Sequence, residues 1–290
     1  MSFRKTLRKA FIGGDWYVCY KKKDSSSYIL ISNPPKKWIA DPFIYEHDGK
    51  LLILGEFYSK SKELGEIYCG LIEGDRIVNH TLLIETKTHM SYPFIFNFNQ
   101  KMYLMPENSQ AGRLALYQID LNTLEVSYLH DILINTDLVD CSILQLKDNI
   151  YVIGYSERKK QLASFLLDSN LYCHSDFFWF PEDHTSRPAG RAIIRNHMLL
   201  QPFQNNSKKY GESIIIKEVI LDKGYINFLT KSEILATDIT FSNFVKIPNK
   251  VHTINMTDNY VIFDVFFEKI DPFRWVKMLR RLAHKKRKIT

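Results

Sequence analysis

The stretch DPFIYEHDGKLLILGEF, from Asp41 to Phe57, decides the fold because variants of it recur along the chain. Tyr92 begins YPFIFNFNQKMYLMPEN, and Asp140 begins DCSILQLKDNIYVIGYS. Weaker copies are RPAGRAIIRNHMLLQPFQ from Arg187 and HTINMTDNYVIFDVF from His252. Each copy starts with a polar or aromatic residue, here called the opener. A short apolar strand, a polar turn and a second apolar strand then follow.

Turns such as His47-Asp48-Gly49 between two apolar runs are typical of β-hairpins. Successive openers are 51, 48, 47 and 65 residues apart, which is the period of a propeller blade. In three copies the second strand carries Glu56, Glu107 or Tyr155 at the same offset from its opener. This shared register disfavours the alternative of a β-sandwich whose hairpins are similar by accident.

A third apolar segment follows each of the first four hairpins, at 66–71, 113–119, 162–167 and 213–220. The fifth hairpin has no such sequel, and Trp16–Tyr20 near the N-terminus is the expected substitute. A strand from the N-terminus would close the ring and remove exposed sheet edges. The sequence therefore predicts an all-β fold, a five-bladed β-propeller closed by an N-terminal strand.

Length and composition agree with one large domain. The 290 residues are 45% hydrophobic and 13% aromatic, and no run approaches the roughly 20 apolar residues of a membrane span. The N-terminus has no apolar signal core, and the four cysteines are widely spaced, so we expect a cytoplasmic protein with buried, unpaired cysteines. The expected division is a basic segment at 1–11, the propeller at 12–270 and a basic tail at 271–290.

Positive charge is concentrated at the two ends of the chain. Residues 1–11 hold four Lys or Arg, residues 274–290 hold eight, and neither segment has an acidic residue. Removing these twelve charges from the formal net charge of +7 leaves −5 for the rest. Nucleic-acid-binding domains more often carry positive charge across the folded face, so this distribution argues against a nucleic-acid partner.

The C-terminal tail has the pattern of an amphipathic helix. Trp275, Met278, Leu279 and Leu282 follow helical spacing, and Lys and Arg fill the remaining positions. Such a helix is suited to the surface of an anionic membrane. We expect residues 273–288 to bind the cytoplasmic face of the inner membrane; a solvated tail or a helix packed on the propeller is the alternative.

The first strand of each propeller blade lines the central channel, so the openers are expected to converge. Asp41, Asp140 and Glu107 are the candidate catalytic residues, because paired carboxylates can act as general bases or stabilise charge. The candidate substrate-binding residues around them are Glu56, His89, Ser91, Tyr92, Arg187, Arg191, Gln204, His252 and Asn255. No cofactor is indicated, and no His/Asp spacing demands a metal, although a divalent metal stays open.

Each of these residues also has a structural interpretation. Asp41-Pro42 is a common way to open a strand, and Glu56 and Glu107 are suited to ion pairs with arginines. The functional interpretation rests on the equivalent positions of the set. Arg187 and Arg191, with His252, predict a positive pocket for the phosphate of an activated sugar, whereas a sugar hydrolase needs chiefly two carboxylates.

Two motifs resemble the five-bladed propellers of the family-43 glycoside hydrolases. ADPFI at Ala40–Ile44 is similar to the first-blade motif that carries their general base. VDCSIL at Val139–Leu144 is similar to the third-blade motif with the aspartate that tunes the acid. Those hydrolases carry a glutamic acid near the opening of the fourth blade, where this chain has SRPAGR at Ser186–Arg191.

A closer resemblance covers nearly the whole chain. ADPF, SYPFIF, MPENSQAGRLALY, VDCSIL, RPAGR, Gln204 with YGESIIIKEV, and HTIN occur in this order. They resemble the N-terminal domain of plant glucosamine inositolphosphorylceramide transferases and its stand-alone bacterial relatives. The resemblance implies a propeller in a setting of surface-glycan assembly, and it implies no established catalytic residue.

Three hypotheses of function follow. The first is a glycosyltransferase that moves a sugar from an activated donor to a lipid-linked or polysaccharide acceptor, in lipopolysaccharide or capsule synthesis. The second is a glycoside hydrolase-like enzyme, which needs a general acid such as Glu107. The third is a glycan-binding module without chemistry.

Overall fold

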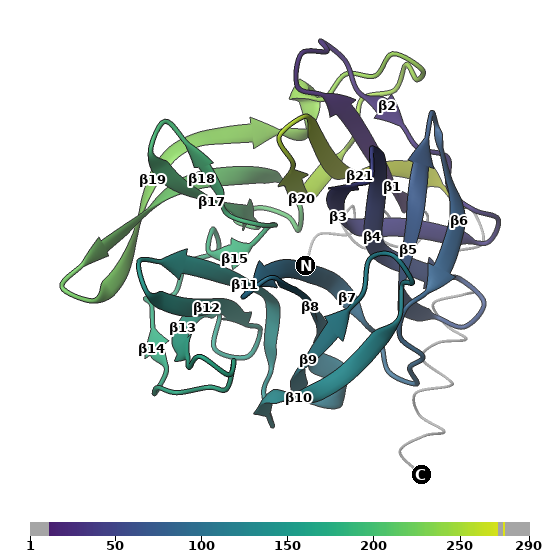
Figure 1. Cartoon of the computed structure of the whole chain (residues 1–290). Coiled ribbons are helices and arrows are strands. Elements are labelled where there is room, and N and C mark those ends of the chain that lie inside the picture. The colour runs from purple at the N-terminus through teal and green to yellow at the C-terminus, as the bar shows by residue number, and fades with distance from the viewer. Residues whose placement is uncertain (1–11, 272–274, 276–290) are drawn as a thin grey trace.

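The computed structural model describes residues 12–271 and Trp275. Five antiparallel sheets form a ring (Figure 1), which confirms the predicted all-β, five-bladed β-propeller. The predicted basic segment 1–11 and the predicted amphipathic helix of 271–290, apart from Asp271 and Trp275, lie outside the described residues. Within the described part of the chain, no helix has the length and apolarity needed to cross a membrane.

The first three blades each use four consecutive strands, with the first strand of each nearest the channel. In order, these strands are β3 (Lys37–His47), β4 (Lys50–Ser59), β5 (Leu64–Glu73), β6 (Arg76–Leu82), β7 (Ser91–Phe98), β8 (Lys101–Asn108), β9 (Arg113–Ile119), β10 (Val126–Ile134), β11 (Leu138–Leu146), β12 (Asn149–Ser156), β13 (Gln161–Leu167) and β14 (Phe178–Trp179). A short 3-10 helix, Ser109–Ala111, connects β8 to β9.

In the fourth blade the inner strand is broken into two short pieces that both pair with the same neighbour. The strands are β15 (Arg187–Pro188), β16 (Ile193–Arg195), β17 (Met198–Asn205), β18 (Ser213–Asp222) and β19 (Tyr225–Leu235). A second 3-10 helix, Ala236–Asp238, follows. The break explains why this copy of the repeat is weak in the sequence.

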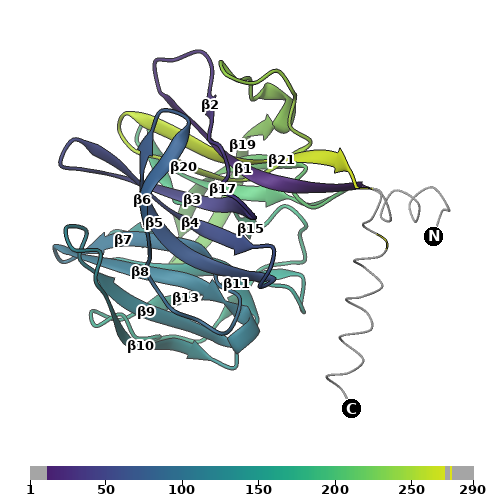
Figure 2. The ribbon, with the colours of Figure 1, turned by 90° about the vertical axis from the view of Figure 1, so that its right-hand side faces the viewer.

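The fifth blade joins the two ends of the described chain. Its strands are β20 (Lys250–Met256), β21 (Tyr260–Ile270), β1 (Ile12–Lys22) and β2 (Ile29–Leu30), with β1 between β21 and β2. Pairing of β1 with β21 runs without a register shift from Ile12 opposite Ile270 to Lys22 opposite Tyr260, and Figure 2 shows the two strands side by side. The predicted closure by an N-terminal strand is confirmed.

Apolar side chains from adjacent blades fill the space between them. Phe43 of β3, for example, packs edge-on against Tyr92 and Phe94 of β7, and all three are at most 1% exposed. The four cysteines are unpaired; Cys19, Cys69 and Cys141 are buried as expected, whereas Cys173 is only half-buried. Burial of this apolar surface, at about 25 cal/mol for each Å², is the main contribution that holds the ring together.

A β-bulge occurs at the opener in four of the five blades. In β3, Asp41 and Pro42 together face the single residue Gly55, because the register shifts between Ala40 and Phe43. Equivalent shifts occur in β7, β11 and β20. Asp41, Tyr92 and Asp140 are left-handed there, with φ of 48°, 43° and 50°, a conformation that costs non-glycine residues roughly 1 kcal/mol or more. The bulge bends the strand and re-aims the opener.

Gly190 explains the RPAGR sequence in physical terms. Its φ is +132°, and a Cβ at this position would lie 1.9 Å from the Ile254 carbonyl oxygen of the fifth blade. A hydrogen bond holds the two backbones close at this point, because the Ile254 N–H donates to the Ala189 carbonyl at 2.8 Å. A residue without a side chain is therefore required where the fourth and fifth blades meet.

We predict that Gly190→Ala lowers the free energy of unfolding by about 4 kcal/mol or more, because backbone must move to admit the methyl group. Gly74→Ala is the matched control, since Gly74 is also left-handed (φ +59°) but has open space around it, and its expected loss is about 1 kcal/mol. Urea unfolding of both variants measures the difference. Equal losses would contradict the assigned role of Gly190.

Candidate functional site

Hydrogen bonds between blades link the bulged openers. The Asp41 N–H donates to Asp264 Oδ2 of the fifth blade at 2.9 Å, and the Tyr92 N–H donates to Asp41 Oδ2 at 3.2 Å. The Asp140 N–H donates to Glu107 Oε2 at 3.3 Å. At these three openers the N–H that the bulge releases is thus accepted by a carboxylate of the preceding blade, whereas at the bulge of β20 the His252 and Thr253 N–H groups donate to Asp264 of the same blade. Since buried N–H groups need partners, these acids are part of the architecture as well as candidates for chemistry.

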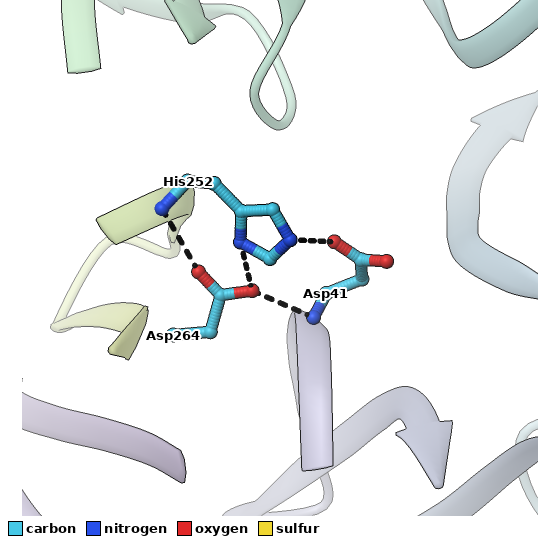
Figure 3. Close-up of side chains that lie close together, drawn as sticks. All are labelled: Asp41, His252 and Asp264. Atoms are coloured by element: carbon cyan, nitrogen blue, oxygen red, sulfur yellow. Dashed lines mark hydrogen bonds and ion pairs between the residues drawn. The ribbon is translucent and has the colours of Figure 1, made fainter. Parts of the chain in front are cut away.

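His252 lies between two of these acids (Figure 3). Its Nδ1 is 2.6 Å from Asp264 Oδ2, and its Nε2 is 3.5 Å from Asp41 Oδ1. The Trp16 ring of β1 stacks on the imidazole, with centroids 4.0 Å apart and planes 18° apart. Thr253 Oγ1 donates to Asp41 Oδ1 at 2.8 Å. Strands β1, β20 and β21 of the fifth blade and β3 of the first blade therefore build one buried cluster.

Protonation in this cluster is set by burial and by charge. Burial opposes the charged imidazolium, but the Asp264 and Asp41 carboxylates outweigh it and raise the pKa of His252. Burial also raises the pKa of Asp41 to about 6, although His252 opposes that rise. A carboxylate whose pKa lies near neutrality is suited to general-base catalysis, so the electrostatics favour Asp41 among the three candidate catalytic residues.

Asp41, His252 and Asp264 each place one ligand atom within 4.8 Å of the others, close enough for a metal ion. Both ring nitrogens of His252, however, face carboxylate oxygens. In this arrangement the imidazolium is the cation that the two acids share. A metal would fit only after the ring gave up one of these ion pairs.

Arg187 is held by acids on two sides. Its Nε lies 2.5 Å from Asp140 Oδ2, and its Nη1 lies 2.6 Å from Glu157 Oε1. Gln204 Nε2 donates to the same Asp140 oxygen at 2.7 Å, and the Tyr210 ring lies 5.6 Å from the guanidinium. Burial disfavours the charge, but the neighbouring Asp140 raises the pKa of Arg187. Arg187 therefore stays charged and is balanced by two carboxylates.

Two glutamates near the openers have raised pKa values. Burial, and then the charge of Asp140, raise the pKa of Glu107 to about 8. Burial and the charge of Asp41 raise the pKa of Glu56 well above its ordinary value. His89 lies beside Glu56, with Nε2 3.3 Å from Oε1. Its Nδ1 accepts the Gly65 N–H at 3.0 Å, which places the proton of the neutral ring on Nε2, toward Glu56.

The opener end of the channel, defined by Asp41, Asp140 and His252, is therefore acidic. The sequence predicted a positive pocket, and the structure corrects this. Arg187 is balanced by Asp140 and Glu157, and His252 is shared by Asp41 and Asp264. Two cations, Arg187 and His252, thus face four carboxylates even when Glu56 and Glu107 are left out of the count. The four are Asp41, Asp140, Glu157 and Asp264.

Tyr92 closes the channel behind the openers. Its side chain is fully buried, and its hydroxyl lies 2.8 Å from Ser142 Oγ and accepts the Gly190 N–H at 2.6 Å. Neighbouring Ser91 is also buried and pairs with Glu107 in the sheet register. Tyr92 and Ser91, predicted to bind substrate, thus lie within the packed interior.

Arg191 and Asn255 lie on the far side of Tyr92 from this cluster. Asn255 is 1% exposed and binds backbone, accepting the Arg191 N–H and donating to the Pro42 carbonyl, both at 2.8 Å. The Arg191 Nη2 donates to the Ile44 carbonyl at 3.3 Å. Arg187 and Arg191 contact different residues, so the predicted sharing of one phosphate by the two arginines is corrected.

Sequence reasoning missed several members of the site. They are Trp16, Glu157, Tyr210, Thr253 and Asp264. A signal existed for Asp264, which is an isolated acid in the apolar run VIFDVF at 261–266. Buried charges of this kind are paired, and the opener of that copy, His252, was the available partner.

Comparison with known proteins places these motifs in a family. Residues 25–247 match the family model described as glucosamine inositolphosphorylceramide transferase 1, N-terminal. The transferase 1 protein of Arabidopsis thaliana is 25% identical over 229 residues, which are 73% of this chain and 28% of that protein. The corresponding protein of Oryza sativa subsp. japonica is 27% identical over 199 residues, 64% of this chain and 26% of that protein. The chain spans about a quarter of the length of these curated relatives.

Similar solved structures are glycan-cleaving enzymes. The catalytic domain of the Coprinopsis cinerea GH62 α-L-arabinofuranosidase has a TM-score of 0.59 at 11% identity and covers 89% of this chain and 98% of that one. A GH43 β-xylosidase/α-arabinofuranosidase from a compost metagenome also has a TM-score of 0.59, at 9% identity, covering 86% of this chain and 95% of that one. At these identities the likeness establishes a shared fold.

We predict that the melting temperature falls as the pH rises from 5 to 9. The folded state keeps a proton on Glu107, whose pKa is raised from 4.5 to about 8, whereas the unfolded chain has already lost it. This proton contributes on the order of 5 kcal/mol to the free energy of unfolding. The contribution is fully present below pH 4.5 and is lost as the pH rises through 8. A fall of roughly 10 °C is expected, measured by scanning calorimetry.

Glu107→Gln should flatten this profile, because glutamine still accepts the Asp140 N–H but has no proton to lose. Glu233→Gln is the control. Hydrogen bonds from Ser213 and Asn205 lower the pKa of Glu233. The stability that its carboxylate contributes is therefore constant above pH 5, and its removal should not change the slope of the profile. A Glu107→Gln profile as steep as that of the wild type would show that Glu107 does not hold the proton.

Proposed function

The chain belongs to the family of the glucosamine inositolphosphorylceramide transferase 1 N-terminal domain, and from this we propose that it is a glycosyltransferase whose reaction occurs at the opener end. The donor is an activated sugar, and the acceptor is a hydroxyl of a growing glycan. The observation that carries the proposal is the arginine at the fourth opener. A phosphate leaving group needs a cation beside it, whereas the sugar leaving group of a glycosidase needs a proton donor.

Arg187 supports this role by the way it is oriented. Asp140 and Glu157 hold Nε and Nη1, while Nη2 has no hydrogen-bond partner among the described residues. We assign Nη2 to the donor phosphate, because arginine presents a planar fork that matches phosphate oxygens. Gln204 and Asp140 then act as positioning residues, since they fix the guanidinium plane.

Asp41 is the proposed general base. Transfer breaks the bond between the sugar and the phosphate, forms a bond from the acceptor oxygen to the sugar, and passes the acceptor proton to Asp41. Asp41 is preferred because burial raises its pKa to about 6, close to the pH at which a general base must exchange a proton. Glu107, Glu56 and His89 line the same acidic region and would bind sugar hydroxyls.

We predict that Asp41→Asn reduces transfer by at least about 100-fold, the contribution of a positioned general base. The assay incubates the full chain with a panel of radiolabelled nucleotide sugars and membrane-extracted glycan acceptors. Asparagine keeps an oxygen for the Tyr92 N–H, so the variant should stay folded.

Glu157→Gln is a milder test of Arg187 positioning and should raise the KM for the donor more than it lowers kcat.

A hydrolase-like activity is the second candidate, and one observation favours it. Glu107, with a pKa of about 8, is a carboxylic acid that would be protonated at neutral pH, as a glycosidase general acid must be. The same assay separates the candidates, because hydrolysis releases free sugar from neutral glycosides without a nucleotide donor. Binding of glycans with neither reaction would indicate a glycan-binding module instead.

We further propose that the acceptor is lipid-linked and that the chain works at the cytoplasmic face of a membrane, in lipopolysaccharide or capsule synthesis. Support comes from charge and topology. Ile12 and Ile270 are paired, so the two positions at which the basic segments join the propeller lie side by side. Together they hold twelve Lys or Arg, each contributing about 1 kcal/mol near an anionic surface.

We predict that replacing Lys285, Lys286, Arg287 and Lys288 with Gln weakens binding to vesicles containing anionic phospholipid by about 100-fold or more. The control is the same number of replacements at lysines of the hairpin turns, Lys50, Lys101, Lys147 and Lys223. Co-sedimentation at two salt concentrations measures both. Equal binding by the two variants would remove the membrane from the proposal.

A further inference from the structure

The opposite end of the channel, where the hairpin turns lie, holds an open cavity of about 1080 Å³ between the fourth and fifth blades. Its polar and charged lining includes Lys21, Lys23, Glu46, Arg191, Arg195 and Asp258. Ile193, Ile254 and Met256 supply apolar wall, and Tyr45 adds an aromatic ring. Ligand pockets are typically about 300–1,000 Å³, so the cavity has room for a small organic molecule.

This cavity is separate from the opener end. Tyr45 follows Asp41 by four residues in β3, which at about 3.3 Å for each residue places it roughly 13 Å along the channel. The buried Tyr92 side chain, held by Ser142 and Gly190, lies between the two regions. A ligand in the cavity would therefore not reach Asp41.

Arg191 has no compensating acid in the part of the chain that the structure describes. Its Nε is buried and lacks a hydrogen-bond partner, while Nη2 donates to the Ile44 carbonyl. No carboxylate of the described residues forms an ion pair with it, and burial lowers the pKa of Arg191 with only Tyr45 and Tyr92 acting against that effect. An uncompensated, desolvated guanidinium is costly to a protein, and a bound anion would relieve that cost.

The other charges that line the cavity balance one another. Lys21, Lys23 and Arg195 are matched in number by Glu46, Asp238 and Asp258. Arg191 therefore leaves the cavity with one excess positive charge. That excess favours an anionic ligand over a neutral one or a cation.

We propose that this hairpin-end cavity is a second binding site, for a phosphorylated small molecule whose phosphate binds Arg191. Lys23 and Arg195 also line the cavity, and Tyr45 with the apolar wall contacts the organic part of the ligand. The site is independent of the transfer reaction assigned to the opener end. Its occupant is a sugar phosphate or a nucleoside diphosphate, which share the phosphate group that Arg191 recognises.

The test is isothermal titration of the full chain with glucose 1-phosphate, uridine diphosphate and inorganic phosphate, with glucose and glucuronate as controls. We expect at least one organic phosphate to bind with a Kd below 1 mM and both controls to fail. Arg191→Gln should weaken that binding by about 10- to 100-fold, and Lys23→Gln by less. The affinities of glucose 1-phosphate and uridine diphosphate distinguish the two sources of phosphate.

Two comparisons make the assignment falsifiable. Lys147→Gln should leave the affinity unchanged, because Lys147 is exposed in a hairpin turn of the third blade and does not line the cavity. Binding that is lost in Arg187→Gln but retained in Arg191→Gln would place the ligand at the opener end and overturn the second site. The melting temperature of ligand-free Arg191→Gln should equal or exceed that of the wild type, since an uncompensated charge is removed. Failure of every phosphate to bind, or binding of glucuronate as tight as that of the phosphates, would also overturn it.

Discussion

The structure depends on the need to satisfy the backbone N–H groups that the bulges release. A bulge at an opener takes one N–H out of its own sheet, and at Asp41, Tyr92 and Asp140 that N–H is buried. The partner is in each case a carboxylate from the preceding blade. Blades of a propeller otherwise adhere through apolar contacts, which are weakly directional. The carboxylate-to-amide bonds give the ring a fixed register around its axis.

This constraint has a chemical consequence. Acids recruited to accept buried N–H groups are themselves desolvated and brought close to one another, and both effects raise a carboxyl pKa. The pKa values of Asp41 and Glu107 are raised for these reasons, and against the effect of burial the Asp264 and Asp41 carboxylates raise the pKa of His252. The groups whose protonation changes near neutral pH are therefore the groups that hold the blades together, so chemistry and stability at this site respond to pH together.

The sequence predicted what the repeat encodes and missed what departs from it. One offset from the opener is shared by Glu56, Glu107 and Tyr155, because each pairs with the residue before its opener. This regularity identified the propeller and most of the opener end. Asp264 has a different offset, because the hairpin of the fifth blade is two residues shorter and Asp264 faces the bulge itself.

The sequence grouped Arg191 with Arg187 because they are four residues apart. The inner strand of the fourth blade is broken between them, and the chain carries Arg191 past Gly190 to the other side of Tyr92. Tyr210 comes from a loop, where the repeat gives no register.

The separation of the two arginines divides the electrostatics of the channel. At the opener end, Arg187 already balances Asp140 and Glu157, so a phosphate gains less there than an isolated arginine would provide. A sugar ring gains more, because its hydroxyls can donate to several carboxylates at once. If transfer occurs at this end, most of the binding energy must come from the sugar, and Arg187 must act chiefly on the charge that develops as the phosphate leaves. Interactions that strengthen only as charge develops accelerate the reaction rather than tighten ground-state binding, and an arginine held between two acids is arranged for that role.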